Sequence, residues 1–568
     1  MVSRNRLFRQ ACLLLVGALS LACDRAGAAE GDAVTVMEPF VVLASKGPPW
    51  RYFSVPGFEV LSRCPDRFNE AYARALRQSV AARAAVLPPG FFADLATPVK
   101  ILLYNKAPEK DRLLNRSAPA DLQMSPLGDA LEGAGVIEET SPVVAGDGDT
   151  FIICGNYWNL ISSVTDLSID PDTDLRLQLR TPAFPAWFKA GATGRFGVFA
   201  HRIIQSAVIG RSVAAWPNAF WISRDETVAL RKNPKHPRES LPLAELFAGS
   251  GRGPRQDLWN SAAALFVRWG LFGKDADGSL YRSAFLRFVE RATREPVTEQ
   301  LFRECLGLSL AEAQRRLDDY LPRAVSESVS APFAASADEE PDIRDATPDE
   351  VARIIGDWGR FAGQPLSVGL GGFANRDDSG EGLDQAAKLF ERTYANGNRE
   401  PRFLAAYGLS KAQIGDAVAA RAALEAATAA GVVRPKAYLE LARLRLGASR
   451  WDRAQGTGES GEDDFEEIWR LTATARRQMP SLLGCYQMMI RLFERAPRTP
   501  THEELAVLGE AVQRFPRNAA FICQVATLYR HCGYPDDARA IIERAKELAE
   551  SPDTRAILAG FDTPSRQP

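Results

Sequence analysis

Residues that often carry enzyme chemistry are sparse in this chain of 568 residues. The four histidines are His201, His236, His502 and His531, and none has a second histidine four residues later. A catalytic zinc helix of the His-Glu-x-x-His type needs two histidines one turn apart, with a glutamate between them that activates water. After His502 the chain reads Glu503-Glu504-Leu505-Ala506, so that motif is not completed.

A serine between small and apolar residues is the next candidate, in Gly307-Leu308-Ser309-Leu310-Ala311. A nucleophile elbow needs glycine on both sides of the serine and a strand before it. The sequence predicts no strand there. Ser309 with Glu312 instead fits a capping box for a helix over 310–320, and we favour this interpretation.

Acidic and glycine-rich stretches are the remaining candidates for ligand binding. Asp170, Asp172 and Asp174 alternate, and Asp275-Ala276-Asp277-Gly278 is similar to the start of a calcium loop. The glutamate that would close such a loop is replaced by Ala284 or Leu286, depending on register, so solvated turns are favoured over calcium binding. The spacing of Gly191, Gly194 and Gly197 indicates close helix packing, and His201 on an apolar helix is typical of a core residue.

One segment, Thr181 to Ala192, resembles a peptidase motif in all but its metal ligand. With Pro185, Trp187 and Gly191 it is similar to the Pro-x-Trp-Φ-x-Glu-Gly-x-Ala segment of secreted peptidases of the MA clan, the gluzincins. In that family the glutamate is the third zinc ligand, and Ala190 stands at its position. The stretch Ile161 to Arg180, where the zinc helix would lie, holds no histidine. The resemblance therefore implies a gluzincin-like scaffold with no metal, no cofactor and no peptidase activity.

The elements around this segment predict an α+β domain, with a small sheet followed by a helical half. Alternating and apolar runs predict strands over 34–43, 52–61 and 99–104, a hairpin of 136–144 with 150–155, and a helix over 65–87. Further helices are predicted over 185–200, 241–247, 258–272, 279–294, 297–306 and 310–320. The gluzincin resemblance extends to 239–247, 258–269 and 306–312.

The C-terminal part carries an internal repeat. Ala386, Ala420 and Ala454 are 34 residues apart, as are Gly408 and Ala442. With Leu404, Tyr407, Leu424 and Ala427, and again at 522–545, this spacing resembles tetratricopeptide (TPR) repeats, which stack as helical hairpins. We predict four to five units, one of them stretched by a polar insertion over 455–464. A capping box at Thr347-Pro348-Asp349-Glu350 starts the array.

Stacked hairpins form a concave face that suits a peptide or protein partner. The ninth positions of successive first helices are Leu409, Arg443, Arg491 and Thr527, with Arg530 nearby. The groove residues Arg443, Arg491 and Arg530 make this face slightly basic, so an acidic segment is the predicted partner.

Composition limits the partners and suggests export. A net charge of -2 and a pI near 6.3 give no general attraction to nucleic acid or anionic membrane. Arg4, Arg6 and Arg9, an apolar run over 11–22 and Ala26-Gly27-Ala28-Ala29 match a secretory signal, which predicts a periplasmic or extracellular protein. Ser20-Leu21-Ala22-Cys23 resembles a lipobox, so a lipid anchor at Cys23 is the alternative to simple cleavage. No later stretch is apolar enough for a transmembrane helix.

These observations divide the chain into a signal peptide (1–28), a degenerate peptidase-like domain (29–325), a linker (326–345), TPR-like repeats (346–560) and a tail (561–568). The cysteines are too sparse for a disulfide scaffold. Cys523 and Cys532 should not pair, because a helix would separate them by about 13 Å. Cys64 with Cys154 is the one pair we consider.

The favoured function is an exported, non-catalytic scaffold that binds a protein partner. A hydrolase with an unidentified metal-independent site in the N-terminal cleft is the alternative, and a purely structural repeat protein is a third.

Overall fold

The computed structural model describes residues 49–64, 66–91, 95–103, 141–144, 150–154, 179–192, 218–221, 241–249, 255–275, 277–326, 329–332, 341–362, 379–448, 459–478, 481–496, 499–549 and 552–561. They all belong to one unit of the chain, Lys46–Pro568. The predicted signal segment with Cys23, the predicted strand over 34–43, His201 and His236 lie outside the described residues. So does the expected position of a zinc helix, apart from residues 179–180.

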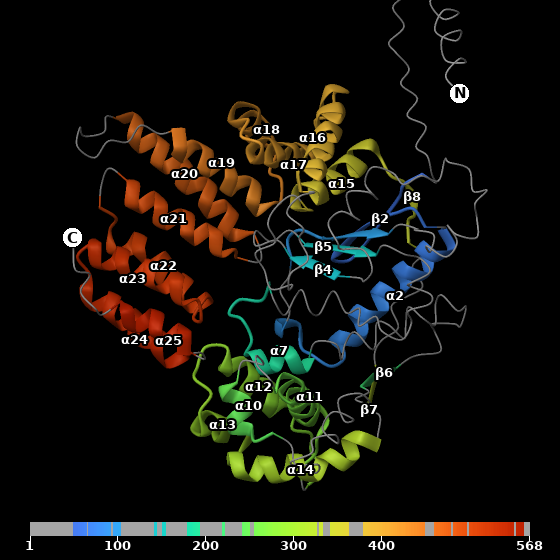
Figure 1. Ribbon diagram of the computed structural model, residues 1–568, viewed down its shortest axis with the longest axis vertical. Helices are drawn as coiled ribbons and strands as arrows, with labels where there is room; N and C mark the ends of the chain where they lie inside the picture. The colour runs from blue at the N-terminus through green and yellow to red at the C-terminus, as the bar shows by residue number, and fades with distance from the viewer. Residues whose placement is uncertain are drawn as a thin grey trace, which may run out of the picture. The chain divides into compact units, whose positions relative to one another are not determined.

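A six-stranded mixed sheet forms the N-terminal region (Figure 1). Its strands are β1 (Arg51–Val55), β2 (Phe58–Ser62), β3 (Val99–Leu103), β4 (Ser141–Val144), β5 (Thr150–Cys154) and β8 (Arg344–Asp345). The strand order is β4-β5-β3-β2-β1-β8, so β2 and β3 lie in the middle. The pairs β2–β3 and β3–β5 are parallel and the others antiparallel. Such a sheet followed by helices is the predicted α+β arrangement.

The predicted strand over 52–61 is instead a hairpin. β1 and β2 pair with Val55 opposite Phe58, and Pro56-Gly57 forms the turn between them. Gly57 has a φ of 86°, which glycine adopts without a steric penalty. Apolar residues continue through the turn, so alternation alone does not reveal it. Helix α2 (Asp66–Ala84) then crosses to the parallel strand β3, and β4 and β5 form the predicted hairpin.

The predicted linker, 326–345, contains two short strands. β7 (Val329–Pro332) pairs with β6 (Asn218–Trp221) in a second, two-stranded sheet. β8 pairs with β1, although both of its residues are exposed. These strands depend on backbone pairing with distant segments, which the composition of the linker does not indicate.

The helical half of the N-terminal region follows the predicted order. Its helices are α7 (Ala186–Ala192), α10 (Leu243–Ala248), α11 (Gln256–Phe272), α12 (Arg282–Ala292), α13 (Glu299–Leu306) and α14 (Leu310–Ser326). Thr298 caps the start of α13 by accepting a hydrogen bond from the Leu301 amide, and Gly307 ends that helix with a φ of 72°. α14 runs six residues beyond the predicted end at Tyr320 and contains Pro322.

The C-terminal half is an array of helical hairpins (Figure 1). The hairpins are α15 (Pro348–Ala362) with α16 (Ser379–Ala395), α17 (Pro401–Gln413) with α18 (Ala417–Ala429), α19 (Pro435–Ala448) with α20 (Glu459–Arg477), α21 (Leu483–Arg495) with α22 (His502–Arg514), and α23 (Ala519–His531) with α24 (Pro535–Leu548). A final helix, α25 (Pro552–Gly560), packs on α23 and α24. The predicted all-α array is confirmed at this level. Because α20 begins at Glu459, the second part of the predicted insertion is helical.

The predicted repeat register agrees with the packing inside the α17–α18 hairpin. A Cβ atom on Gly408 would lie 2.7 Å from Leu424 Cγ and 3.2 Å from the Ala420 carbonyl oxygen. Ala420 and Ala427 are both fully buried. Small residues at these positions therefore let the two helices cross closely, as the 34-residue spacing predicts.

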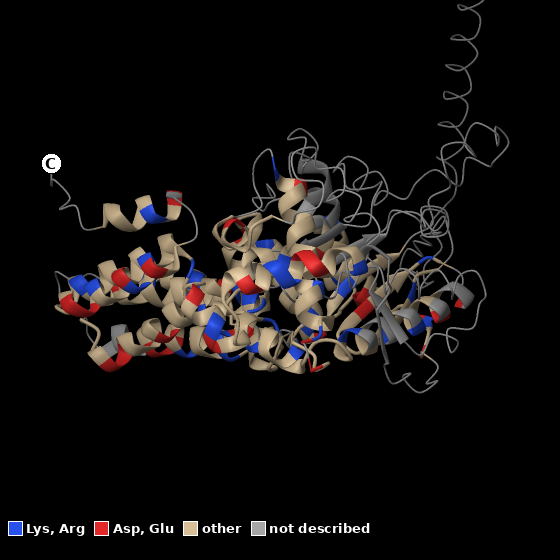
Figure 2. Cartoon of the chain, turned by 90° about the horizontal axis from the view of Figure 1, so that it is seen from below, with Lys and Arg blue, Asp and Glu red and all other residues tan. Residues whose placement is uncertain are grey.

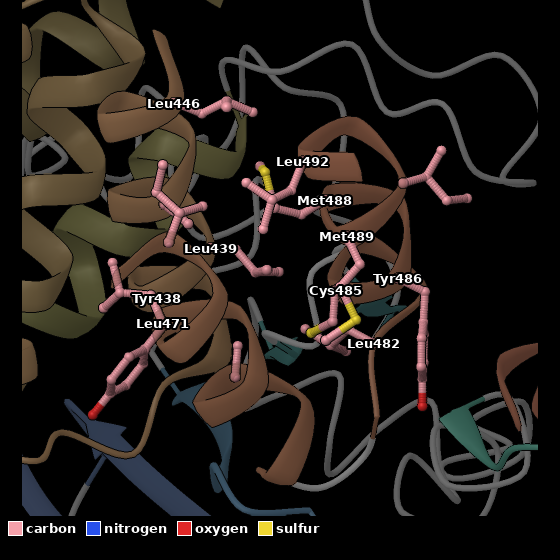
Figure 3. Packing of buried hydrophobic residues seen from close by; sticks show 14 of the residues in the cluster. Tyr438, Leu439, Leu446, Leu471, Leu482, Cys485, Tyr486, Met488, Met489 and Leu492 are labelled. Atoms are coloured by element: carbon pink, nitrogen blue, oxygen red, sulfur yellow. The ribbon is translucent and has the colours of Figure 1, made fainter. Parts of the chain in front are cut away.

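Neighbouring hairpins share one continuous core. The first helices contact one another in the order α15, α17, α19, α21 and α23, whereas the second helices contact chiefly first helices. Figure 3 shows part of this core, with Leu439 and Leu446 from α19 and Met488 and Leu492 from α21. The first helices therefore form the inner layer of the array, and the second helices lie behind them.

Candidate functional site

Trp187 lies at the centre of an aromatic cluster rather than beside polar groups. Its side chain is 2% exposed, and its ring centroid is 5.4 Å from that of Phe247, 5.2 Å from that of Phe266 and 5.7 Å from that of Phe288. Phe285 also contacts Trp187, and we call these five residues the aromatic cluster. Pro185 is buried immediately before α7, so the short helix enters this core at a fixed angle.

Ala190 and Gly191 occupy the rest of the segment that resembles a zinc motif. Ala190 is half-buried and packs against the core that contains the aromatic cluster. A Cβ atom on Gly191 would lie 2.5 Å from the Ala263 carbonyl oxygen and 2.6 Å from Val267 Cγ2. Close approach of α7 to α11 thus requires glycine at position 191. Gly194 and Gly197 lie outside the described residues.

Charged groups near α7 have structural partners. The Arg180 guanidinium lies 4.1 Å from the Phe184 ring centroid, donates a 2.9 Å hydrogen bond to the Pro182 carbonyl and forms an ion pair with Glu290. Burial lowers the pKa of Arg180, and the Glu290 carboxylate opposes this shift. Among the described residues, no group of three or more His, Cys, Asp or Glu side chains could hold a metal ion.

The other sequence candidates have local structural roles. Ser309 Oγ accepts a 3.1 Å hydrogen bond from the Glu312 amide, which confirms capping of α14. Asp275 forms an ion pair with Arg316, and Asp277 accepts a 2.8 Å hydrogen bond from the Ser279 amide. Hydrogen bonding to the Ser279 side chain, and then to its amide, lowers the pKa of Asp277. Asp170, Asp172 and Asp174 are outside the described residues.

Within the described ranges, His502 and the cysteines are not grouped with other potential catalytic residues. His502 is the first residue of α22, and its Nε2 lies 3.1 Å from an Asp537 carboxylate oxygen on the surface. Cys523 and Cys532 form no disulfide with each other. Cys64 is also a free, buried thiol, so the considered pair with Cys154 is not formed. Burial raises the pKa of Cys64 to about 11, which disfavours its reactive thiolate.

The predicted groove arginines lie on three successive first helices, α19, α21 and α23. Arg443 is exposed and forms an ion pair with Glu440, whereas Arg530 places its guanidinium 4.7 Å from the Phe561 ring centroid. Arg491 is exposed and has no ion-pair partner within the described ranges. Leu409 does not line an open groove, because its apolar side chain is buried.

A buried group of charges joins the sheet to the first hairpins, and the sequence analysis did not find it. Glu59 of β2 is 2% exposed and forms ion pairs with Arg353 of α15 and Arg402 of α17. The Tyr52 hydroxyl donates a 3.3 Å hydrogen bond to the same carboxylate. Burial alone would raise the pKa of Glu59, but attraction to Arg353 and Arg402 outweighs it and lowers the pKa.

A second buried carboxylate lies beside the first. Asp357 of α15 is fully buried, and its oxygens lie 3.4 Å from Lys100 Nζ of β3 and 2.9 Å from Arg434 Nη2. We call the six charged residues the sheet–solenoid junction: Glu59, Lys100, Arg353, Asp357, Arg402 and Arg434. Charged residues inside the otherwise apolar strands 58–62 and 99–103 were the available signal, although their partners lie about 250 to 340 positions away.

The N-terminal region also contacts the C-terminal hairpins of the array. Arg517, between α22 and α23, donates hydrogen bonds of 2.6 Å and 2.7 Å to the carbonyls of Ala292 and Thr293. These carbonyls end α12, where a positive charge is favourable. Arg544 of α24 donates a 3.0 Å hydrogen bond to the carbonyl of Arg294.

No protein-family model matches this sequence, and no curated protein matches it. Among solved structures, a thermophilic TPR protein from Thermus thermophilus is similar to part of the chain, with 20% sequence identity and a TM-score of 0.23. The matched region covers 32% of this chain and 90% of that chain. The hairpin assignment rests on the contacts between this chain's own helices.

Residues of both charge signs occur throughout the described helices. In Figure 2 the ribbon positions of lysine and arginine are interleaved with those of aspartate and glutamate along the described helices. None of these helices combines the length and the apolar character needed to cross a membrane.

Proposed function

We propose that this chain is a non-catalytic scaffold that binds another protein through the first helices of its C-terminal array. The observation that carries this proposal is the exposed polar face of α21 and α23. Gln524, Arg491 and Arg530 are exposed there, although both helices have buried apolar faces on their other sides. Stacked helical hairpins use such an extended face to bind peptides and proteins.

The N-terminal region is proposed to be a degenerate relative of the zinc peptidases, kept for its scaffold. Ala190 at the position of a ligand, and packing residues around it, support this interpretation. Export to the periplasm or the extracellular space is proposed from Arg4, Arg6 and Arg9 and the apolar run over 11–22. Detection of a diacylglyceryl group on Cys23 would establish the lipid-anchored form.

Site-specific photocrosslinking tests the scaffold function. A photoreactive amino acid at Gln524 of the full chain faces the proposed partner side, and one at Glu543, exposed on α24, is the matched control. We expect a discrete crosslinked protein from position 524 and none from position 543. Equal crosslinking from both positions, or none from either, would contradict the proposal.

Metal analysis tests the proposed absence of catalysis. We expect the dialysed full chain to hold no stoichiometric zinc and to cleave no peptide. Ala190→Glu should recover neither property, because one carboxylate cannot replace three protein ligands. One zinc ion per chain, or a peptidase activity that a chelator abolishes, would instead support the hydrolase alternative.

A further inference from the structure

The inner layer of the array is buried at its N-terminal end, around α15 and α17, and exposed at its C-terminal end, around α21 and α23. In α17, residues Phe403 to Ser410 are all buried, so this first helix presents no free face. Its second residue, Arg402, forms an ion pair with Glu59 of β2. Glu59 also pairs with Arg353 of α15, so ion pairs attach the chain's own sheet to α15 and to the start of α17.

The corresponding positions of the later helices are uncovered. The second, fifth and ninth residues of α21 are Gly484, Gln487 and Arg491, which are half-buried or exposed, and Glu494 and Arg495 beyond them are exposed. α21 has α19 and α23 on either side and second helices behind it. Exposed residues of α21 must therefore face the remaining side, which is the inner surface of the array.

The open face carries more positive than negative charge. In the described part of the chain, Arg491, Arg495 and Arg530 have no ion-pair partner, and the Arg530 guanidinium lies over the Phe561 ring, so Glu494 is outnumbered. Other exposed arginines, such as Arg539 on α24, pair with a carboxylate of their own helix. Unpaired guanidinium groups on one face are available to carboxylates of a partner.

The open face also provides groups that suit an extended backbone. Gln487 of α21 and Gln524 of α23 place two amide side chains on adjacent first helices. Gly484 and Ala520 at the starts of these helices leave room for a main chain to approach. Amide side chains can both donate to and accept from a peptide bond.

We propose that the inner face is divided: the chain's own sheet permanently fills the α15–α17 part through Glu59, and the α21–α23 part binds an extended, Asp/Glu-containing segment of another protein. This proposal rests on the proposed scaffold function, and it names the region and the partner's chemistry.

Fluorescence anisotropy with a labelled ten-glutamate peptide tests the division in the full chain. Arg491→Ala and Arg495→Ala should each weaken binding about threefold to fivefold, as for charges at the rim of an interface. Arg539→Ala removes one exposed positive charge from α24 and should leave binding unchanged. Arg402→Gln, which keeps a hydrogen-bond donor for Glu59, should also leave it unchanged. Unchanged melting temperatures establish that each variant is folded.

Three results would overturn the proposal. Equal weakening by Arg539→Ala would show general charge attraction, and weakening by Arg402→Gln would show that the α17 part is open. The third is an absence of peptide binding. If a partner still crosslinks from position 524 and does so equally in Arg491→Ala, this inference fails while the scaffold function stands.

Discussion

Around Trp187, aromatic rings pack 5 to 6 Å apart with no charged member in the cluster, whereas around Glu59 six charged side chains converge between the sheet and the first hairpins. The central residues of the two regions, Trp187 and Glu59, are each 2% exposed. The aromatic cluster is stabilised by buried area and shape, so its stability does not depend on one partner. The sheet–solenoid junction depends on pairing, because each buried charge is costly alone. Loss of one charge should therefore destabilise the junction, whereas added side-chain volume should destabilise the aromatic region.

The largest effect is expected at the junction. Glu59→Gln leaves Arg353 buried without its carboxylate and should lower the free energy of unfolding by about 3 to 5 kcal/mol. Chemical denaturation of the full chain measures this. Glu299→Gln breaks an exposed ion pair with Arg303 in α13 and should leave the denaturation midpoint nearly unchanged. Similar midpoints for both variants would mean that the junction does not stabilise the fold.

A smaller effect is expected where the hairpin helices cross. Ala427→Phe should overpack the α17–α18 contact and lower the free energy of unfolding by about 2 to 3 kcal/mol. Ala426 is the adjacent, exposed residue of the same helix, so Ala426→Phe is the control and should change little. Equal melting temperatures would show that the repeat register is wrong. Ala420→Phe should behave like Ala427→Phe.

Gly191→Ala extends the comparison to the aromatic cluster. The added methyl group would meet the Ala263 carbonyl and separate α7 from α11, at about 1 to 2 kcal/mol. Gly90→Ala is the control, because a Cβ there has nothing within 4 Å. Thermal melting should separate the two variants, and no separation would argue against close packing of α7.

The stability contributed by the sheet–solenoid junction should depend on acidic pH, whereas the stability contributed by close packing of α7 should not. The pKa of Glu59 is lowered in the folded chain, so its contribution to stability is present above the unfolded pKa, about 4.3, and is lost as pH falls through the folded value. Glu59→Gln should therefore lose less stability than the wild type between about pH 5 and pH 3. Gly191→Ala should keep the wild-type pH dependence. Parallel curves for all three proteins would contradict the lowered pKa.

Much of the fold could be predicted because its signals are local. Helices such as α11 and α18 have apolar periodicity and clear ends, and the 34-residue spacing located the crossing at Gly408 and Ala420. The hairpin of β1 and β2 was missed because apolar residues continue through Pro56-Gly57. β8 was missed because it forms by pairing with β1, far away in the chain.

The candidate site was less predictable for a related reason. Arg443, Arg491 and Arg530 could be placed on successive first helices from the repeat, but the repeat does not indicate which of them pair. The ion pair between Arg402 of α17 and Glu59 of β2 joins residues hundreds of positions apart. A single sequence carries no signal for such a pair beyond a charge in an apolar strand.

The hydrogen bonds from Arg517 to the end of α12 have a mechanical consequence. An array of stacked hairpins can extend and bend like a spring, because each unit contacts only its neighbours. Here the array is tied to the N-terminal region twice, near its start through Glu59 and near its end through Arg517. Two attachments to the same region restrict how far the helices between them can extend. The separation between the start of the array and Arg517 is thus held by contacts within the chain, and α19 and α21 lie between these two attachment points.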